Sequence, residues 1–208
     1  MAPRPVLDKR GRLAAIATTP RVALEIGCGH LRRHPGAVSI DIRDYETVDV
    51  VGDVYDVLAR VPDASVDAAY SSHFVEHLDD VERFVLELGR VMKIGGVVTT
   101  VAPHFSNPYF YSDYTHRRAF GLYSFSYLSR DAVFRRTVPR YIADTGFDLV
   151  SARLIFKAPR PFYLGWALGR VAQTLVNVTT ATKEWYERRW CYLMPCYEVE
   201  YVLVRVKS

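Results

Sequence analysis

Two glycines, one residue apart, follow an apolar run that contains a single acid. The run, Val-Ala-Leu-Glu-Ile-Gly-Cys-Gly, spans residues 22–29, with Glu25 inside it. Gly27 and Gly29 permit positive φ and leave no Cβ in the way, so a ligand can lie directly on the backbone around Cys28. A carboxylate in a buried strand needs a cationic or hydrogen-bonding partner, and a ligand amino group would serve. The stretch therefore predicts a central strand that ends at a binding site for a positively charged ligand.

Two more acids are expected at the same edge of the sheet. Asp41 lies near the end of the predicted strand 37–42, and Asp53 follows the predicted strand within 48–54. A carboxylate at the tip of the neighbouring parallel strand points into the ligand crevice, where it can accept both hydroxyls of a ribose. The dinucleotide pattern Gly-x-Gly-x-x-Gly is incomplete, because Arg32 stands where the third glycine would be. We therefore expect a ribose-containing ligand without a pyrophosphate.

The composition is that of a globular protein. The 208 residues are 50% hydrophobic and 24% charged, which fits a single domain, 1–208, with a sizeable core. The net charge of +4 permits an anionic substrate but does not indicate a nucleic-acid partner. Three cysteines form no Cys-x-x-Cys pair, which favours a reducing cytoplasm. No signal peptide or transmembrane segment is expected, because residues 1–20 lack a long apolar core and no apolar run reaches about 18 residues.

Strand and helix patterns alternate after the glycine turn. Residues 65–72 and 97–101 have the pattern of the fourth and fifth strands, and apolar residues at helical spacing fill 81–92 between them. A capping box at Asp79 precedes this helix. The link 30–36 is too short for a full crossover helix. The alternation predicts an α/β fold with a doubly wound, mostly parallel sheet of seven strands.

Five short motifs occur in order between residues 22 and 103. They are Leu-Glu-Ile-Gly-Cys-Gly, Ser-Ile-Asp-Ile, Gly-Asp-Val, Ser-Ser-His-Phe-Val-Glu-His-Leu and Gly-Arg-Val-Met-Lys-Ile-Gly-Gly. In this order and spacing they resemble the class I S-adenosylmethionine-dependent methyltransferases. The short first crossover is similar to that of the small, glycan-associated members, the methyltransferase type 11-like subgroup. The resemblance implies a Rossmann-like sheet whose last strand, 198–207, is antiparallel.

The resemblance also implies S-adenosylmethionine as the cofactor, with a role for each motif. The methionine end would lie on the glycine turn, the ribose at Asp41 and the adenine at Asp53. The exposed side of the cofactor would face the residues just past the fourth strand. The implied cofactor-binding residues are Glu25, Gly27, Cys28, Gly29, Asp41, Asp53, Ser72 and His73.

An insertion after the fifth strand, 104–130, is expected to bind the methyl acceptor. Nine of the 24 residues from His104 to Tyr127 are Phe or Tyr. Aromatic rings stack on the C–H faces of sugars, while hydroxyl and ionisable groups bind sugar hydroxyls. We therefore expect a carbohydrate acceptor, and an aromatic lid packed on itself is the alternative. The expected acceptor contacts are Tyr109, Tyr111, Tyr114 and Arg117.

Histidine is the natural general base for a hydroxyl acceptor, because its pKa lies near neutrality. His116 follows an acid, Asp113, that can orient its ring, and His104 follows the proline that ends the fifth strand. We rank His116 and His104 nearly equal as catalytic residues, with Asp113 in support and His73 third. No metal site is assigned. Magnesium held by His104, Asp113 and His116 is the alternative, although this set is rich in nitrogen for that ion.

A second insertion, 158–197, precedes the last strand. In it an apolar seam repeats at intervals of three and four residues. Seams of this width usually pack on another helix, so we expect a homodimer contact or a substrate lid rather than a membrane surface. The seam consists of Leu164, Leu168, Val171, Leu175 and Val178.

These patterns together predict a methyltransferase that acts on a carbohydrate hydroxyl with a histidine base. The resemblance suggests a mannoside or a polysaccharide precursor as the acceptor. Two alternatives stay open. One is an O-methyltransferase of a small phenolic or lipid-like metabolite, and the other is a non-catalytic regulatory protein that binds the cofactor.

Overall fold

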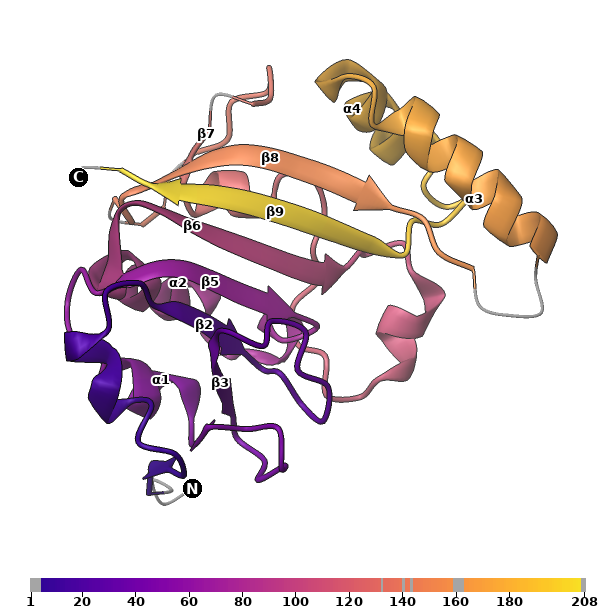
Figure 1. Cartoon of the computed structure of the whole chain (residues 1–208). Coiled ribbons are helices and arrows are strands. Elements are labelled where there is room, and N and C mark those ends of the chain that lie inside the picture. Colours follow the sequence, from indigo (N-terminus) through magenta and orange to yellow (C-terminus); the bar gives the residue numbers. More distant parts are fainter. Residues whose placement is uncertain (1–4, 132, 140, 143, 159–162, 207–208) are drawn as a thin grey trace.

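A single twisted sheet forms the centre of the computed structural model, which describes residues 5–131, 133–139, 141–142, 144–158 and 163–206 (Figure 1). The described strands follow the order β1-β4-β3-β2-β5-β6-β9-β8-β7 across the sheet. Their bounds are β1 Leu7–Asp8, β2 Ala23–Ile26, β3 Val38–Asp41, β4 Val50–Val51, β5 Val66–Ser72, β6 Met92–Pro103, β7 Arg130–Asp131, β8 Phe147–Ile155 and β9 Glu198–Arg205.

The sheet has the predicted mixture of parallel and antiparallel pairs. Strands β4, β3, β2, β5 and β6 run parallel to one another, and β9 is antiparallel to both of its neighbours, β6 and β8. The predicted α/β fold with an antiparallel last strand is thus confirmed. The predicted number of strands, seven, is corrected to nine within the described residues, because the two-residue segments β1 and β7 pair with the two edges.

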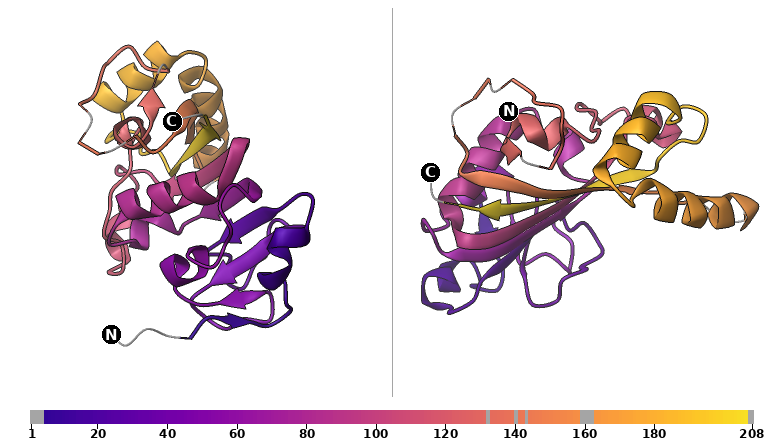
Figure 2. Two further views of the ribbon diagram at one scale, coloured as in Figure 1. Left: turned by 90° about the vertical axis from the view of Figure 1, so that its left-hand side faces the viewer. Right: turned by 90° about the horizontal axis from the view of Figure 1, so that it is seen from above.

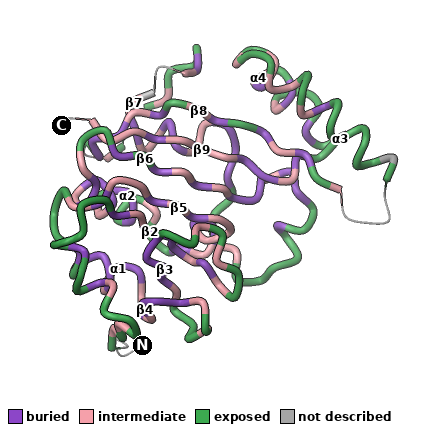
Figure 3. Tube along the Cα trace, in the orientation of Figure 1, coloured by how far each residue is buried: buried purple, intermediate pink, exposed green. Residues whose placement is uncertain are grey.

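Two helices cover one face of this sheet (Figure 2). They are α1, Val54–Leu58, and α2, Val81–Val91, which contact each other. The apolar face of α2 is buried as the spacing predicts, but its N-cap is Asp80 rather than Asp79, because Asp80 accepts a hydrogen bond from the amide of Arg83. The central strands are correspondingly buried (Figure 3).

Four short 3-10 helices lie between the strands and α-helices of the described residues. They are η1 Ala14–Thr18, η2 Val75–His77, η3 Pro108–Ser112 and η4 Ser124–Tyr127. The link 30–36 contains no helix, as its length predicts. The chain therefore passes directly from the glycine turn after β2 into β3.

The second insertion forms two helices at one end of the sheet (Figures 1 and 2). They are α3, Tyr163–Val176, and α4, Thr180–Arg189. Four residues of the predicted seam, Leu168, Val171, Leu175 and Val178, are 56–67% exposed, while the side chain of Leu164 lies outside the described part. Among the described residues, no helix has the length and apolar character needed to cross a membrane.

Candidate active site

The glycine turn after β2 presents open backbone on one side. Gly27 and Gly29 have φ of +69° and +58°, a conformation that favours glycine. Phe74 packs against Gly27 so closely that a Cβ there would lie 2.5 Å from Phe74 Cδ2, whereas a Cβ on Gly29 would meet no atom within 4 Å. Phe74 therefore covers the backbone at Gly27, whereas the backbone at Gly29 is uncovered.

Glu25 holds this turn to the short link that follows it. Its carboxylate is buried, and its two oxygens accept hydrogen bonds from the amides of Arg33 at 2.8 Å and His34 at 3.0 Å. These amides have no helical partners, because the link is too short to form a helix. The expected hydrogen-bonding partner of Glu25 is thus found in the link itself.

The two other predicted acids lie at the tips of neighbouring strands. Asp41, at the end of β3, accepts hydrogen bonds from the amides of Gly29 and Arg43, each at 2.8 Å. Asp53 caps α1 by accepting from the amide of Tyr55 at 2.9 Å. Each carboxylate oxygen has a second lone pair, so both acids can still accept hydrogen bonds from a ligand.

A cavity of about 530 Å³ brings most of these residues together. Its lining includes Gly27, Gly29, Asp41, Asp53 and His73. Ile42, Tyr45, Tyr55 and Phe74 add apolar and aromatic surface to the same walls. This volume and this mixture of a few polar groups in an apolar lining are typical of cofactor sites.

The remaining predicted cofactor residues line an adjacent cavity of about 210 Å³. It includes Glu25, Cys28 and Ser72, and it shares Gly27 with the larger cavity. Burial, together with the charges of Asp41 and Glu25, raises the pKa of the Cys28 thiol to about 11. Cys28 is therefore a neutral thiol at physiological pH and packs beside the turn.

His73 is held between two carboxylates. It lies at φ +54°, its Nε2 donates to Oε1 of Glu198 at 2.8 Å, and its Nδ1 lies 3.4 Å from Oε1 of Glu76. The hydrogen bond with Glu198 and the nearby carboxylate of Glu76 raise the pKa of His73 to about 9. A ring that is already protonated near neutrality cannot accept a proton, so His73 is unsuited to be the base.

The two leading histidines lie in different surroundings. His116 is partly accessible, and its Nε2 lies 3.5 Å from Oδ2 of Asp113. His104 is fully buried, where its Nδ1 accepts a hydrogen bond from the amide of Ser106 at 3.1 Å. Neither histidine lines the two cavities described above, but the His116 ring lies 4.9 Å from that of His77, which lines the larger one. The three residues of the alternative magnesium site, His104, Asp113 and His116, do not converge either.

The aromatic insertion divides into a buried and an exposed part. Phe110, Phe120 and Phe125 are buried in the protein, as a self-packed lid would require. The predicted acceptor contacts are on the surface instead: Tyr109, Tyr111 and Tyr114 are 55%, 69% and 96% exposed, and Arg117 forms an ion pair with Asp79.

The sequence-based reasoning missed the role of Glu76. Its side chain is fully buried, although it belongs to η2 at the end of β5. His77 lies next to it in the chain, and His77 and Thr115 line the larger cavity. The signal was available, because a strand followed by His-x-x-Glu-His places three ionisable side chains within five residues.

Asp49 was also missed. Its carboxylate is inaccessible to solvent and forms ion pairs with Arg10 at 2.7 Å, Arg12 at 3.4 Å and Arg32 at 3.1 Å. It also accepts a hydrogen bond from the amide of Ser39 at 3.1 Å. Asp49 therefore connects three segments near the glycine turn: the N-terminal segment through Arg10 and Arg12, the short link through Arg32, and β3 through Ser39.

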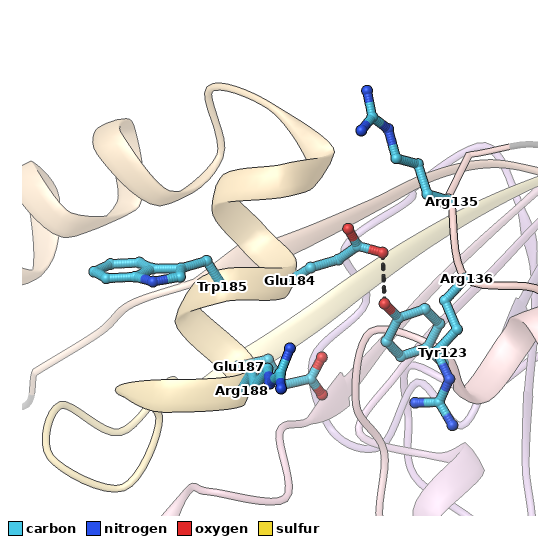
Figure 4. A pocket seen from close by; sticks show the side chains of 7 residues that line it. All are labelled: Tyr123, Arg135, Arg136, Glu184, Trp185, Glu187 and Arg188. Carbon is cyan, nitrogen blue, oxygen red and sulfur yellow. Dashed lines mark hydrogen bonds between the residues drawn. The ribbon is translucent and has the colours of Figure 1, made fainter.

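A second large cavity, of about 770 Å³, lies between α4 and the segment that contains Tyr123 (Figure 4). The Tyr123 hydroxyl donates to Glu184 at 2.5 Å, and the guanidinium of Arg136 stacks 5.0 Å from the Tyr123 ring centre. Burial and the Glu184 contact raise the pKa of Tyr123, which therefore stays a donor. Trp185 and Arg188, both on α4, also line this cavity.

Comparison with known proteins finds a similarity to one family. Residues 33–100 match a family model described as a methyltransferase domain. This part of the chain, from the link before β3 into β6, is thus similar to methyltransferase domains. A comparison with curated proteins finds no match.

Solved structures show that this chain shares its fold with S-adenosylmethionine-dependent methyltransferases. A SAM-dependent methyltransferase from Archaeoglobus fulgidus is 16% identical, with a TM-score of 0.58 over 93% of this chain and 90% of that one. A chain from the complex of the Haloferax volcanii Trm112 methyltransferase activator with a methyltransferase is 16% identical, with a TM-score of 0.55 over 97% and 91%. Phosphoethanolamine N-methyltransferase 2 from Haemonchus contortus, in complex with S-adenosylmethionine, is 14% identical, with a TM-score of 0.53 over 95% and 53%.

The residues of the larger cavity fit the cofactor that this fold implies. The open backbone above Gly29 can support an extended ligand, and Asp41 offers free lone pairs to a pair of hydroxyls. Tyr45, Tyr55 and Phe74 supply flat surfaces for a base. The polar groups and the volume of this cavity therefore suit S-adenosylmethionine.

Proposed function

We propose that this methyltransferase transfers a methyl group from S-adenosylmethionine to a hydroxyl group of a carbohydrate. The observation that carries the proposal is that two kinds of residue line the same cavity. Gly27, Gly29 and Asp41 line the same cavity as His77 and Thr115, which adjoin His116. Groups suited to the cofactor thus lie beside groups suited to a hydroxyl.

Bound S-adenosylmethionine supplies a methyl group on a sulfonium, which a nucleophile displaces in line. The glycine turn and Asp41 would hold this donor in one orientation, and such positioning accounts for much of the acceleration in transfers of this kind. His116 would accept the hydroxyl proton at Nε2, because its Nδ1–H donates to the carbonyl of Phe110 at 2.8 Å. Asp113, 3.5 Å from Nε2, stabilises the resulting imidazolium.

The surface next to this site supports a sugar acceptor. Tyr109 and Tyr111 lie on η3 with more than half of each side chain exposed, and the Tyr109 ring lies 6.2 Å from that of Tyr197. Exposed tyrosines offer apolar faces for stacking and hydroxyls for hydrogen bonding. A mannoside or a polysaccharide precursor has both kinds of surface.

Transfer of a labelled methyl group to a panel of sugars tests the proposal. We expect label on mono- or oligosaccharide hydroxyls, and His116→Ala should lower kcat by about 10²- to 10⁴-fold while the affinity for S-adenosylhomocysteine is unchanged. The control is His30→Ala, an exposed histidine in the link, which should retain full activity. Label found only on phenols or lipids would favour the alternative acceptors, and no transfer to any class would favour a regulatory protein.

We further propose that α3 pairs with a second copy of the chain. The exposed apolar side chains of Leu168, Val171 and Leu175 support this, because they repeat at the spacing of a helix-packing seam. Sedimentation velocity should show a dimer that Leu175→Asp converts to a monomer. Ile94→Asp replaces an equally exposed apolar residue outside α3 and should leave the dimer intact. A wild-type monomer at every concentration would exclude the pairing.

A further inference from the structure

The carboxylate of Glu76 is buried without the hydrogen bonds that a buried charge normally has. Its exposed fraction is 0%, and neither oxygen has a hydrogen-bond partner among the described residues. The nearest ring nitrogens are Nδ1 of His73 at 3.4 Å and Nε2 of His116 at 4.0 Å from Oε1. Buried carboxylates are normally paired, hydrogen-bonded or bound to a metal. Within the described residues, Glu76 therefore has only these long contacts with ring nitrogens and no hydrogen bond to its carboxylate.

Two imidazoles next to Glu76 are held in the tautomer that suits a metal ligand. His116 donates its Nδ1–H to the carbonyl of Phe110 at 2.8 Å. Thr115 donates its hydroxyl to Asp113 at 2.6 Å, so the Thr115 oxygen accepts the Nδ1–H of His77 at 3.0 Å. Both histidines therefore keep a free lone pair on Nε2. Metal-binding histidines are typically oriented in this way, by a hydrogen bond from the other ring nitrogen to a carbonyl or carboxylate-linked group.

The three side chains converge. One potential ligand atom from each of Glu76, His77 and His116 lies within 4.8 Å of the other two. No other group of three or more such side chains converges in this way in the part of the chain that is described, and His104 is not in the group. A single ion between them would satisfy the unpartnered carboxylate and both lone pairs together.

We propose that Glu76, His77 and His116 bind a divalent transition-metal ion at the rim of the cofactor cavity. Two imidazole nitrogens and one carboxylate suit zinc, cobalt, iron or manganese, whereas magnesium prefers oxygen ligands throughout. Three protein ligands leave a coordination position open, as in catalytic rather than structural sites. His77 lines the cavity, so the proposed ion would lie next to the cofactor cavity.

His73 links Glu76 to Glu198. Its Nε2 donates to Glu198, and its Nδ1 lies 3.4 Å from Oε1 of Glu76 without a hydrogen bond to it. Glu198 is also paired with Lys157 at 2.6 Å. His73 is thus a positioning residue for Glu76 rather than a ligand in the proposed site.

The role of the ion deepens the proposed function and rests on it, although ion binding does not. A hydroxyl bound at the open position would have a lowered pKa and would lose its proton to water. Its oxygen would then form the C–O bond with the methyl carbon while the C–S bond breaks, and the electron pair would remain on sulfur as a neutral thioether. His116 would act as a ligand in this mechanism rather than as the proton acceptor.

Titration of the metal-free protein with Zn²⁺, followed by calorimetry, tests the site without cofactor or acceptor. We expect one ion per chain, with visible absorption bands when Co²⁺ replaces Zn²⁺. His77→Ala, His116→Ala and Glu76→Gln should each weaken binding by at least about tenfold. The control His30→Ala removes an exposed histidine elsewhere and should bind as the wild type does. Circular dichroism checks folding, and the two histidine variants decide the result if Glu76→Gln does not fold.

The outcomes test the metal site and its role in methyl transfer independently. Unchanged Zn²⁺ affinity in both His77→Ala and His116→Ala would overturn the site, whatever the activity. Equal methyl transfer by metal-free and metal-loaded wild type would overturn the role and leave His116 as the base. Zn²⁺ binding that depends on all three residues, in a protein that transfers no methyl group, would support the site while the proposed function fails.

Discussion

Replacing Asp49 with alanine is expected to lower the free energy of unfolding by about 3 kcal/mol or more. The Asp49 side chain is inaccessible to solvent, and it pairs with Arg10, Arg12 and Arg32, of which Arg32 is itself 17% exposed. Removing the carboxylate leaves Arg32 and the Ser39 amide without their partner in a poorly solvated place. Urea unfolding at neutral pH measures the change.

The matched control is Asp44→Ala. Asp44 also pairs with a cation, Lys9, at 2.6 Å, but its side chain is 60% exposed. An exposed pair of this kind contributes less than about 1 kcal/mol. Equal losses of unfolding free energy in the two variants would mean that burial does not increase the contribution of Asp49.

The contribution of Asp49 should also depend on pH. Burial alone would raise the pKa of Asp49, but hydrogen bonds from Ser39 and Arg10 and the charge of Arg32 hold it below the ordinary value of 3.8. The unfolded chain therefore takes up the proton at a higher pH than the folded chain does. The stabilisation is complete above about pH 4 and is lost as the pH falls through the native pKa. The difference in the free energy of unfolding between the wild type and Asp49→Ala should therefore become smaller as the pH falls over that range.

Gly27→Ala is expected to weaken cofactor binding and to destabilise the protein. A non-glycine residue at φ +69° costs about 1 to 3 kcal/mol, and the new Cβ would lie 2.5 Å from Phe74 Cδ2. Phe74 lines the larger cavity, so any shift that relieves this overlap changes the cofactor site. Calorimetry with S-adenosylhomocysteine should show affinity reduced by at least about tenfold, which corresponds to about 1.4 kcal/mol.

Two further variants isolate the cause of this effect. Gly36→Ala adds a Cβ that meets no atom within 4 Å, at a position without positive φ, and should leave stability and affinity unchanged. Phe74→Ala combined with Gly27→Ala removes the overlap but keeps the backbone strain, and should recover part of the stability. Normal affinity in Gly27→Ala would contradict the assignment of the turn to the cofactor.

The central strands could be located along the chain because each has a local pattern. The apolar run before Gly27, the acid at the tip of β3 and the helical spacing of α2 are each visible within a few residues. The strands β1 and β7 could not be predicted, because the pairs Leu-Asp and Arg-Asp contain no apolar run and pair only where a sheet edge is nearby. The cap of α2 was misplaced by one residue, since Asp79 and Asp80 are chemically alike.

The candidate site was predictable where one motif supplies one group. Asp41 and Asp53 lie in the cavity because the ends of parallel strands meet at one edge. Glu76 and His116 are far apart in the chain, so their proximity depends on how the insertion folds back across η2. His104 and His116 looked equivalent in sequence, and only burial distinguishes them.

The link between β2 and β3 is held by charge and amide hydrogen bonds instead of a packed helix. Arg33 and His34 donate to one carboxylate, that of Glu25, and Arg32 reaches another, that of Asp49. A packed helix tolerates small sequence changes along its face, whereas two adjacent amides aimed at one carboxylate tolerate no change of length. Inserting or deleting a single residue within 30–32 would move both donors out of reach together. Loop grafting between this protein and relatives with a longer crossover must therefore exchange Glu25 and Asp49 with the loop.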